Sequence, residues 1–443
     1  MTTPAHNHHD DRPHRHHYDA EMLSVEEARD RILSYFERLD AVETPLIEAL
    51  GMVLAEELRA EFDIPPLPNS AMDGYAVLTS DLAAASPGSA VELPVSGSVA
   101  AGSLPAGPLI AGTAVRIMTG APLPEGADAV VPFEDTDELE RQRHGAPGDA
   151  IGIRHSPKPG DNIRAAGEDM KRGDLAVRAG TMLRAGEIGV AASLGRRSVL
   201  AYKRPVVAIV STGDELLEPG QPHEAGKIYN SNAYSVAAEV KKYGGVPRVI
   251  GIARDTIESL NEKLDEALDA DMVVTSAGVS KGDYDVVKDV LAKNGEIALW
   301  SVRMRPAKPL AFGTLNANDG RKVPHLGLPG NPVSALVAFE QFGRPAIHKM
   351  MGRTPLPKPT VTAVLDDPVH NYDGRRVYSR VVVYRSDDGT LRARSTGTQS
   401  SGALSSMAAA NGLAICPDDV AKIDAGQKVT VEMLDWPEDV FSG

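Results

Sequence analysis

The sequence predicts a multidomain α/β plus β protein, with a three-layer α/β domain, flanking β-rich domains and a small C-terminal β-barrel. Strand-like and helix-like segments alternate between residues 206 and 351, which is typical of a mostly parallel sheet covered on both faces. On either side of this region, short apolar runs alternate with turns rich in Gly and Pro, which indicates β structure. A chain of 443 residues is also too long to fold around a single core.

The α/β domain is predicted from the periodicity of its apolar residues. The helix expected at 256–269 has Leu260, Leu264 and Leu268 on one side, spaced as the buried face of a helix. The other expected helices are 232–243, 286–293 and 333–351, and the expected strands are 206–210, 246–253, 272–275, 297–302, 310–313 and 324–328. Parallel sheets bind ligands beyond the carboxyl ends of their strands, so the chemistry is expected in the loops that follow these strands.

The rest of the chain is divided by composition and turn signals. Residues 1–19 hold half of the 12 histidines and read as a disordered tail, which either binds nickel or zinc loosely or has no specific role. Ser24 and Glu27 form a capping-box pattern, which predicts the start of a helix. The predicted domains are a discontinuous N-terminal linker domain (20–64 and 174–200), a β-rich domain (65–173), the α/β domain (201–352) and the C-terminal β-barrel domain (353–443).

Charge and composition argue against several classes of protein. The chain has 46 Lys and Arg against 61 Asp and Glu, and the resulting net charge of −15 argues against nucleic-acid binding. Cys416 is the only cysteine, which leaves neither a disulfide framework nor a four-cysteine zinc site. The sequence has no run of 18 apolar residues and no apolar signal core at its N-terminus. We therefore expect no membrane segment and a cytoplasmic protein.

The stretch 271–287 combines a strand, a glycine-rich loop and the start of a helix. Backbone N–H groups of such a loop can approach a phosphate, and a helix N-terminus adds partial positive charge. The same pattern is also common in ordinary turns without a ligand, so this stretch alone does not decide between the two. The loop positions with a possible binding role are Gly278, Ser280, Lys281 and Gly282.

Charged residues recur in the loops after the predicted strands. The acidic ones are Asp214, Glu215, Asp255, Asp283 and Asp285, and the basic ones are Lys281, Arg303, Arg305 and Lys308. Bare carboxylates repel an anionic ligand, so a divalent cation is expected between them, and Mg²⁺ prefers hard oxygen ligands. The chain has neither a P-loop motif nor a dinucleotide fingerprint, which argues against ATPases and dehydrogenases. A phosphate-containing substrate with Mg²⁺ is the prediction from the residues themselves.

Several longer segments occur in a fixed order between residues 65 and 336. They read PPLPNSAMDGYAV, RIMTGAPLPEGADAVV, NIRAAGED, STGDEL, SAGVSKGDYD, RPAKPLAFG and LPGNPVSA. Together they closely resemble the molybdopterin molybdenumtransferase family, which includes the bacterial MoeA proteins and the C-terminal part of gephyrin. The resemblance implies an elongated homodimer of four-domain subunits with a shared active-site cleft. It also implies insertion of molybdate into adenylylated molybdopterin, release of AMP, assistance by Mg²⁺ and transient contact with the molybdopterin adenylyltransferase.

The resemblance also implies roles for single residues. It implies catalytic roles for Asp73, Thr119, Glu215, Asp255 and Asp285, the last three as ligands of Mg²⁺ or partners of the pterin amino groups. In the family, the residues matching Asp73 and Thr119 face the α/β domain of the partner subunit. The implied substrate-binding residues are Arg164, Asp169, Thr212, Gly213, Gly278, Ser280, Lys281, Gly282, Arg305, Lys308, Pro329, Pro332 and Ser401.

Two positions depart from the family pattern, which commonly has Lys where this chain has Ser301 and Arg305. Arg305 keeps the positive charge, whereas Ser301 loses it, and Lys281 can replace that charge from the opposite side. Two other functions stay open: a non-catalytic molybdopterin-binding or scaffold protein like gephyrin, and the adenylyltransferase itself. The retained acidic positions argue against the first, and the flanking domains argue against the second. The choice between molybdate and tungstate is also left open.

Overall fold

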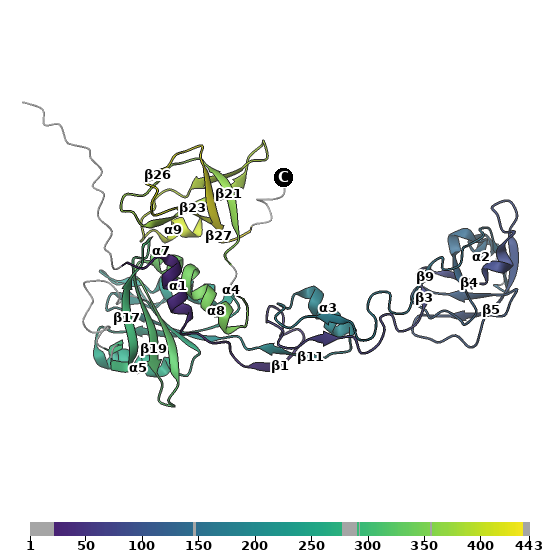
Figure 1. The fold of residues 1–443 in the computed structure, drawn as a ribbon, viewed down its shortest axis with the longest axis horizontal. Coiled ribbons are helices and arrows are strands. Elements are labelled where there is room, and N and C mark those ends of the chain that lie inside the picture. Colours follow the sequence, from purple (N-terminus) through teal and green to yellow (C-terminus); the bar gives the residue numbers. More distant parts are fainter. Residues whose placement is uncertain (1–21, 145–147, 277–289, 292, 355–356, 437–443) are drawn as a thin grey trace, which may run out of the picture. The chain divides into compact units, whose positions relative to one another are not determined.

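The computed structural model describes residues 22–144, 148–276, 290–291, 293–354 and 357–436, and the chain forms two compact units (Figure 1). The first unit contains the residues up to Val42, the short segment Gly51–Val53 and the chain from Ala201 onward. The second unit contains Glu43–Leu50 and Leu54–Leu200. The glycine-rich loop predicted to bind phosphate falls mostly within 277–289, outside the described residues.

A six-stranded sheet with the order β15-β12-β16-β20-β19-β17 is the centre of the first unit. Its strands are β12 (Val206–Thr212), β15 (Val246–Ala253), β16 (Met272–Ser276), β17 (Gly295–Ser301), β19 (Pro309–Asn316) and β20 (Lys322–Leu328). The first four strands in the spatial order are parallel, and β19 is antiparallel to both of its neighbours. Strand β17 therefore runs in the same direction as β20, so the prediction of a mostly parallel sheet is confirmed.

Helices cover both faces of this sheet, which confirms the predicted three layers. On β12, Val207 and Ile209 pack into one hydrophobic core with helices α1, α4, α7 and α8, whereas Ala208 and Val210 pack into a second core with α5. This alternation follows from the two-residue period of a strand. The helices are α1 (Val25–Leu33), α4 (Ser231–Lys242), α5 (Ile257–Ala267), α7 (Pro332–Ala338) and α8 (Arg344–Met350).

Two helix predictions can be compared directly with the structure. The capping box at the start of α1 is confirmed, because Ser24 Oγ accepts the Glu27 N–H at 3.1 Å and Glu27 Oε2 accepts the Ser24 N–H at 2.8 Å. The segment predicted as one helix at 333–351 contains a π-helical stretch, η3 (Phe339–Gly343), between α7 and α8.

The C-terminal part of the first unit is a closed five-stranded barrel, as predicted. The order β23-β24-β21-β27-β25 closes through pairing of β25 with β23. A sixth strand, β18, comes from the α/β part and pairs in parallel with β23, placing Met304 opposite Arg376. The elements are β18 (Met304–Arg305), β21 (Thr360–Leu365), β22 (Val369–His370), β23 (Arg376–Arg385), β24 (Leu391–Ser395), α9 (Leu404–Ala408), β25 (Gly412–Cys416), β26 (Lys422–Ile423) and β27 (Lys428–Met433).

The second unit is built from short strands, as the Gly/Pro-rich sequence indicates. Its main sheet has the order β7-β4-β6-β5-β8, and two two-stranded pairs (β2–β10 and β3–β9) extend the β structure. A third pair, β1–β11, contains residues assigned to both units. The strands of the main sheet are β4 (Gly74–Val77), β5 (Val91–Val99), β6 (Ala114–Ile117), β7 (Ala129–Pro132) and β8 (Ala150–Ile153), and those of the pairs are β1 (Ala41–Pro45), β2 (Leu58–Arg59), β3 (Asn69–Ser70), β9 (Ile163–Arg164), β10 (Leu175–Val177) and β11 (Ser198–Tyr202). Its longer helix is α3 (Ala185–Ser193). Within the described ranges, every helix is too short or too polar to cross a bilayer.

Candidate functional site

The loops after β12 and β15 bring two exposed aspartates together at the carboxyl edge of the sheet. The Asp214 N–H donates to Asp255 Oδ2 at 3.3 Å, and the Asp255 N–H donates to Asp214 Oδ1 at 3.4 Å. Cations lie beside them, because Lys227 Nζ and Arg254 Nη1 donate to the Asp214 carbonyl at 2.5 and 3.4 Å. Among the described residues, each carboxylate thus has one oxygen without a hydrogen-bond donor, which can meet a ligand of the opposite charge.

Glu215 lies on the same edge, and its side chain folds over Gly213. Gly213 has φ +144°, a backbone conformation that favours glycine, and a Cβ atom built there would lie 2.3 Å from Glu215 Oε2 and displace that side chain. The preceding Thr212 is buried, and its hydroxyl donates to the Ser276 carbonyl at 3.4 Å. Among the described residues no three acidic, His or Cys side chains are grouped closely enough to hold a metal ion by themselves. Asp285, the third predicted metal ligand, lies outside those residues.

Asn232, in the first turn of α4, connects the ends of β16 and β20. Its Nδ2 group donates to Ser276 Oγ at 2.8 Å and to the Gly330 carbonyl at 2.7 Å. Asn230 caps the same helix, accepting the Ala233 N–H at 3.3 Å. Helix α7 begins with Pro332, where a missing N–H costs nothing, and its next residue, Val333, donates its N–H to the Ser401 carbonyl at 3.1 Å.

A cavity of about 890 Å³ lies between the α/β part and the barrel. Three residues predicted to bind substrate line it together, namely Arg305, Lys308 and Ser401. Ser334 from α7 and Arg380 from β23 line it as well. The cavity therefore combines cationic and hydroxyl side chains from segments that are far apart in the sequence, and one carboxylate, Asp367, also lines it. The cationic and hydroxyl groups are donors of the kind that bind an oxyanion.

Arg305 is held from the barrel side of this cavity. Its Nη2 donates to the His370 carbonyl at 2.6 Å, and its Nη1 lies 3.6 Å from Asp373 Oδ2. Its guanidinium carbon lies 5.6 Å from the centre of the Tyr372 ring. The fork of an arginine side chain reaches these partners at once, which a lysine ammonium cannot do. This geometry gives a physical reason for Arg at a position where the sequence resemblance implies Lys.

Arg380 was not predicted from the sequence, although it lines the cavity from the barrel side. It is 1% exposed, and it donates to Ser406 Oγ at 2.8 Å and to the carbonyls of Thr398 and Ser400 at 3.1 and 3.0 Å. All of these acceptors are neutral, and no carboxylate of the described chain lies within ion-pair distance. Burial lowers the pKa of Arg380 to about 10, so the side chain stays cationic at neutral pH.

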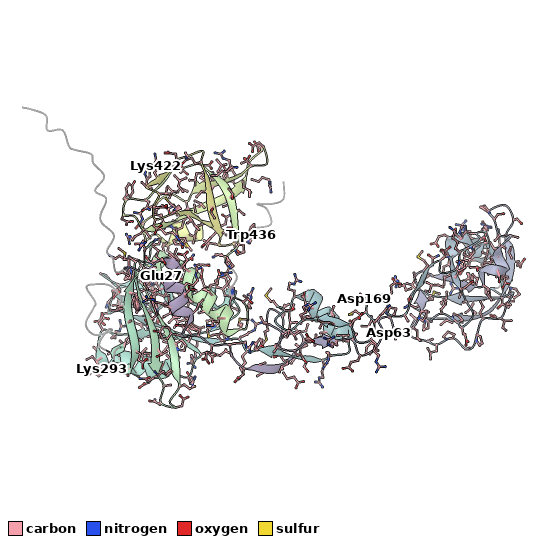
Figure 2. All side chains as sticks on the ribbon, viewed as in Figure 1. Glu27, Asp63, Asp169, Lys293, Lys422 and Trp436 are labelled. Atoms are coloured by element: carbon pink, nitrogen blue, oxygen red, sulfur yellow. The ribbon has the colours of Figure 1, made fainter. Side chains whose placement is uncertain are left out.

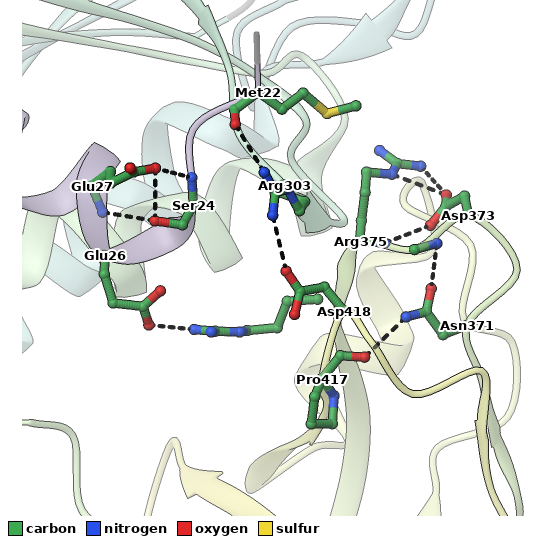
Figure 3. A network of polar contacts seen from close by, with 12 residues as sticks. Met22, Ser24, Glu26, Glu27, Arg303, Asn371, Asp373, Arg375, Pro417 and Asp418 are labelled. Carbon is green, nitrogen blue, oxygen red and sulfur yellow. Dashed lines mark hydrogen bonds and ion pairs between the residues drawn. The ribbon is translucent and has the colours of Figure 1, made fainter. Parts of the chain in front are cut away.

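Arg303, expected to supply charge to a phosphate, has other partners. It donates to the Met22 carbonyl at 3.4 Å and lies 3.5 Å from Asp418 Oδ2 (Figure 3). In the same network, Asn371 donates to the Pro417 carbonyl at 3.0 Å and thereby fixes the loop that carries Asp373. Arg303 is missing from the described residues that line the cavity. It joins the N-terminal segment and the barrel to the α/β part.

In the second unit, the predicted catalytic pair Asp73 and Thr119 is in direct contact. Asp73 Oδ1 accepts the Thr119 N–H at 2.7 Å and the Thr119 hydroxyl at 2.8 Å. These two donors, the backbone N–H first, lower the pKa of Asp73 below its usual value. The turn is fixed by Gly74, where a Cβ atom would lie 2.0 Å from the Val131 carbonyl oxygen. Asp73 is therefore an exposed, fully ionised carboxylate at neutral pH.

Arg164 and Asp169 are also placed in the second unit. Arg164 ends β9 and pairs with Asn69 on β3, and the neighbouring Ser70 accepts the Gly120 N–H at 2.8 Å, so Arg164 belongs to the same turn region as Thr119. Asp169 lies five residues after Arg164 in the chain, and its N–H donates to the Ile64 carbonyl at 3.0 Å. This hydrogen bond places Asp169 close to Asp63 (Figure 2). Both side chains are exposed.

Comparison with known proteins decides the family. Residues 23–195 match a model of the MoeA N-terminal region (domain I and II), residues 208–349 match a probable molybdopterin binding domain, and residues 362–434 match the MoeA C-terminal region (domain IV). Molybdopterin molybdenumtransferase 2 of Mycobacterium tuberculosis is 36% identical over 93% of this chain and 99% of its own length. The chain belongs to the MoeA family of molybdopterin molybdenumtransferases.

Other MoeA relatives match over more than nine-tenths of the chain. The molybdopterin molybdenumtransferase of Haemophilus influenzae is 35% identical over 93% of this chain and 98% of its own length. A crystal structure of the molybdopterin biosynthesis MoeA protein from Pyrococcus horikoshii is 30% identical, covers 94% of this chain and 100% of its own, and has a TM-score of 0.76. The resemblance in the sequence motifs and the multidomain MoeA fold are thus both confirmed.

Within this MoeA family member, the structure brings the predicted residues together in three groups. Glu215 and Asp255 lie at the carboxyl edge with Thr212 and Gly213, and Asp73 contacts Thr119. The cavity group is Arg305, Lys308 and Ser401, with Pro329 and Pro332 in the turn that begins α7. Gly278, Ser280, Lys281, Gly282 and Asp285 lie outside the described residues, so the predicted compensation of Ser301 by Lys281 stays a prediction.

Proposed function

We propose that this protein inserts molybdate into the dithiolene of adenylylated molybdopterin and releases AMP. The observation that carries the proposal is the cavity lined by Arg305, Lys308, Arg380 and Ser401, together with family membership along the whole chain. Molybdate is a compact dianion with four oxygens, and it needs several converging cationic and hydroxyl donors. Arg380 supports this best, because its positive charge is buried among neutral groups. An anion bound in the cavity would compensate that charge.

The carboxyl edge of the sheet is the proposed site of the pterin and its pyrophosphate. The loop at 278–282 would hold phosphate, and Glu215 and Asp255 would hold Mg²⁺ or the pterin amino groups. The donor set fits Mg²⁺, which takes hard oxygen ligands and usually binds one or two carboxylates together with substrate phosphates and water. When bound there, Mg²⁺ supplies stabilisation of the negative charge that develops as the phosphoanhydride bond breaks. Arg305 and Lys308 neutralise charge on the cavity side.

We also propose a homodimer of four-domain subunits in which each cleft uses both chains. Asp73 and Thr119 would face the α/β domain of the partner subunit, where an ionised carboxylate can orient the pterin ring system. Their exposure supports this, because neither side chain is covered within its own unit. The adenylylated substrate is labile and would be open to hydrolysis if it were released into water. Transient contact with the adenylyltransferase that makes it is therefore part of the proposal.

The test is release of AMP from adenylylated molybdopterin by the purified full-length protein, followed with and without molybdate and Mg²⁺. We expect Glu215→Ala and Asp255→Ala to lower this rate by about 10²-fold or more, because each removes a carboxylate that would hold the Mg²⁺ that stabilises charge on the breaking bond. Glu262→Ala, an exposed acidic residue on α5, is the matched control and should keep the wild-type rate. Normal AMP release by both site variants would refute the assigned roles.

The same assay separates the two alternative functions. A scaffold protein of the gephyrin type would release no AMP and would bind a peptide partner tightly. An adenylyltransferase would consume ATP in the presence of molybdopterin, whereas the proposed enzyme consumes none.

A further inference from the structure

We propose that Asn232 is a positioning residue, which holds the strand-end part of the active site in register with the cavity. The inference rests on the proposed function and adds a residue to which neither the motifs nor the family comparison assigns a role. Asn232 is 8% exposed and contacts groups from two other elements, Ser276 at the end of β16 and Gly330 in the turn after β20.

The geometry uses the full donor capacity of the Asn232 side chain. Its Nδ2 group has two hydrogens, and one goes to Ser276 Oγ at 2.8 Å while the other goes to the Gly330 carbonyl at 2.7 Å. Ser276 is itself 2% exposed, so a lost partner there is not replaced easily by water. No other uncharged side chain of this size donates two hydrogen bonds from one atom.

Two hydrogen bonds, joined by the backbone of residues 330–333, connect this amide to the cavity. Gly330 is two residues before Pro332, which opens α7, and the Val333 N–H donates to the Ser401 carbonyl at 3.1 Å. Ser401 and Ser334 line the cavity. Asn232 therefore ties the end of β16, which leads into the predicted phosphate loop, to the turn that positions the cavity wall. The two proposed substrates, pterin phosphate and molybdate, would be held at a fixed separation by these bonds.

The neighbouring Asn230 offers a matched comparison, because it acts mainly as an acceptor. Its Oδ1 accepts the Ser211 hydroxyl at 2.8 Å and the Ala233 N–H at 3.3 Å, and its Nδ2 makes one long contact, 3.4 Å, with Glu218. An aspartate at 230 keeps both accepted bonds and places its second oxygen near Glu218 Oε1, which lowers stability, so the comparison is made on rates normalised to the folded fraction. An aspartate at 232 has the same shape as asparagine and loses both donors, and its oxygen would face the Gly330 carbonyl. The two Asn→Asp changes add the same charge in the same helical turn.

The experiment compares Asn232→Asp with Asn230→Asp in the full-length protein by steady-state AMP release. Because misplacement of about 1 Å can cost about 10²-fold in rate, we expect Asn232→Asp to lower kcat by roughly 10- to 100-fold, with KM changed by less than about threefold. Asn230→Asp should stay within about threefold of wild-type kcat. Rates are normalised to the folded fraction measured by circular dichroism at the assay temperature, since a purely structural role would change that fraction and leave the normalised kcat unchanged.

Ser276→Ala is the second variant, and it serves as the test if Asn232→Asp does not fold. It removes one acceptor of Asn232 and leaves the bond to Gly330, so kcat should fall several-fold. Wild-type normalised kcat in the variants that fold, or equal losses in Asn232→Asp and Asn230→Asp, would overturn the proposal. A wild-type protein that releases no AMP would instead refute the proposed function, so the two failures are distinguishable.

Discussion

Arg380 shows at the scale of one residue how a buried charge indicates a ligand. A desolvated cation normally pairs with a carboxylate, because burial of an unpaired charge is unfavourable. Arg380 instead contacts a hydroxyl and two carbonyls and lines an 890 Å³ cavity. These neutral contacts orient the guanidinium but leave its charge uncompensated, and a dianion such as molybdate would compensate it.

Arg380→Lys tests this role, because lysine keeps the charge, but its single ammonium nitrogen cannot replace donors that Arg380 places on two separate atoms, Nε and Nη2. We expect the KM for molybdate to rise by about tenfold or more and the free energy of unfolding to fall by about 1–3 kcal/mol, since buried carbonyls lose their partners. Arg385→Lys on the same strand is the control, because Arg385 is exposed and donates only to the Gly389 carbonyl among its described partners. An unchanged molybdate KM in Arg380→Lys would separate Arg380 from anion binding.

At the scale of elements, α4 and the π-helical η3 carry a buried pair of carboxyl groups. Glu340, on η3, is 2% exposed, accepts the Tyr243 hydroxyl at 2.5 Å and forms an ion pair with Lys358. Glu239, on α4, lies against it, and one of its carboxyl oxygens is buried without a partner in the described structure. Burial, with repulsion from Glu340 second, raises the pKa of Glu239 well above its usual value, although Lys358 and Lys242 oppose the shift.

This pair predicts a pH-dependent stability. In the folded protein Glu239 retains its proton at a pH where the unfolded chain has lost it, so stability falls as pH rises from the unfolded pKa towards the folded pKa. Glu239→Gln is neutral at every pH, so its stability relative to wild type should increase with pH by up to ~1.4 kcal/mol per unit within that window.

The measurement is urea unfolding of wild type and Glu239→Gln between pH 5 and pH 8. Glu262→Gln on the exposed side of α5 is the control and should change the unfolding free energy by less than about 0.5 kcal/mol. Parallel pH curves for wild type and Glu239→Gln would show that Glu239 is ionised in the folded protein.

At the scale of the whole molecule, the proposed shared cleft predicts complementation between inactive variants. A dimer of one Asp73→Ala chain and one Glu215→Ala chain contains one cleft with both native residues, so it should have about half of the wild-type activity per dimer. The two chains are co-expressed with different tags, and mixed dimers are isolated by two affinity steps. A dimer of Glu215→Ala with Asp255→Ala has no intact cleft and should be inactive. Inactivity of both mixed dimers would place each cleft within one chain.

The sequence predicts the α/β layers and the barrel well, because both depend on local patterns. β-Branched runs and helical spacing identify β12 and α5, and the turn residues Asp388-Gly389 identify the β23–β24 hairpin. Arg305, Lys308 and Ser401 follow from motif resemblance, and the structure places them around one cavity.

Residues that depend on distant contacts could not be predicted in this way. Asn232 meets Ser276 and Gly330, which are 44 and 98 positions away, and only the parallel register of β16 and β20 brings them together. Arg380 is hidden in the strand VYSRVVV, where a single charge among apolar residues gives no signal of what it faces. The π-helical turn at Phe339–Gly343 has no sequence signature among its buried neighbours.

The pairing of β18 with β23 has a consequence for the order in which the site is completed during synthesis. Met304 and Arg305 leave the ribosome before the strand with which they pair. Arg375 donates to the Met304 carbonyl and is synthesised 71 residues after Met304. At about 5–20 residues per second, the segment with Arg305 waits roughly 4 to 14 seconds for its hydrogen-bonding partner. The nascent chain can complete the parallel core of the sheet during this interval, but the cavity wall forms only after the barrel emerges. A ribosome that stalls before the barrel therefore leaves a chain with a folded sheet and no place for the oxyanion.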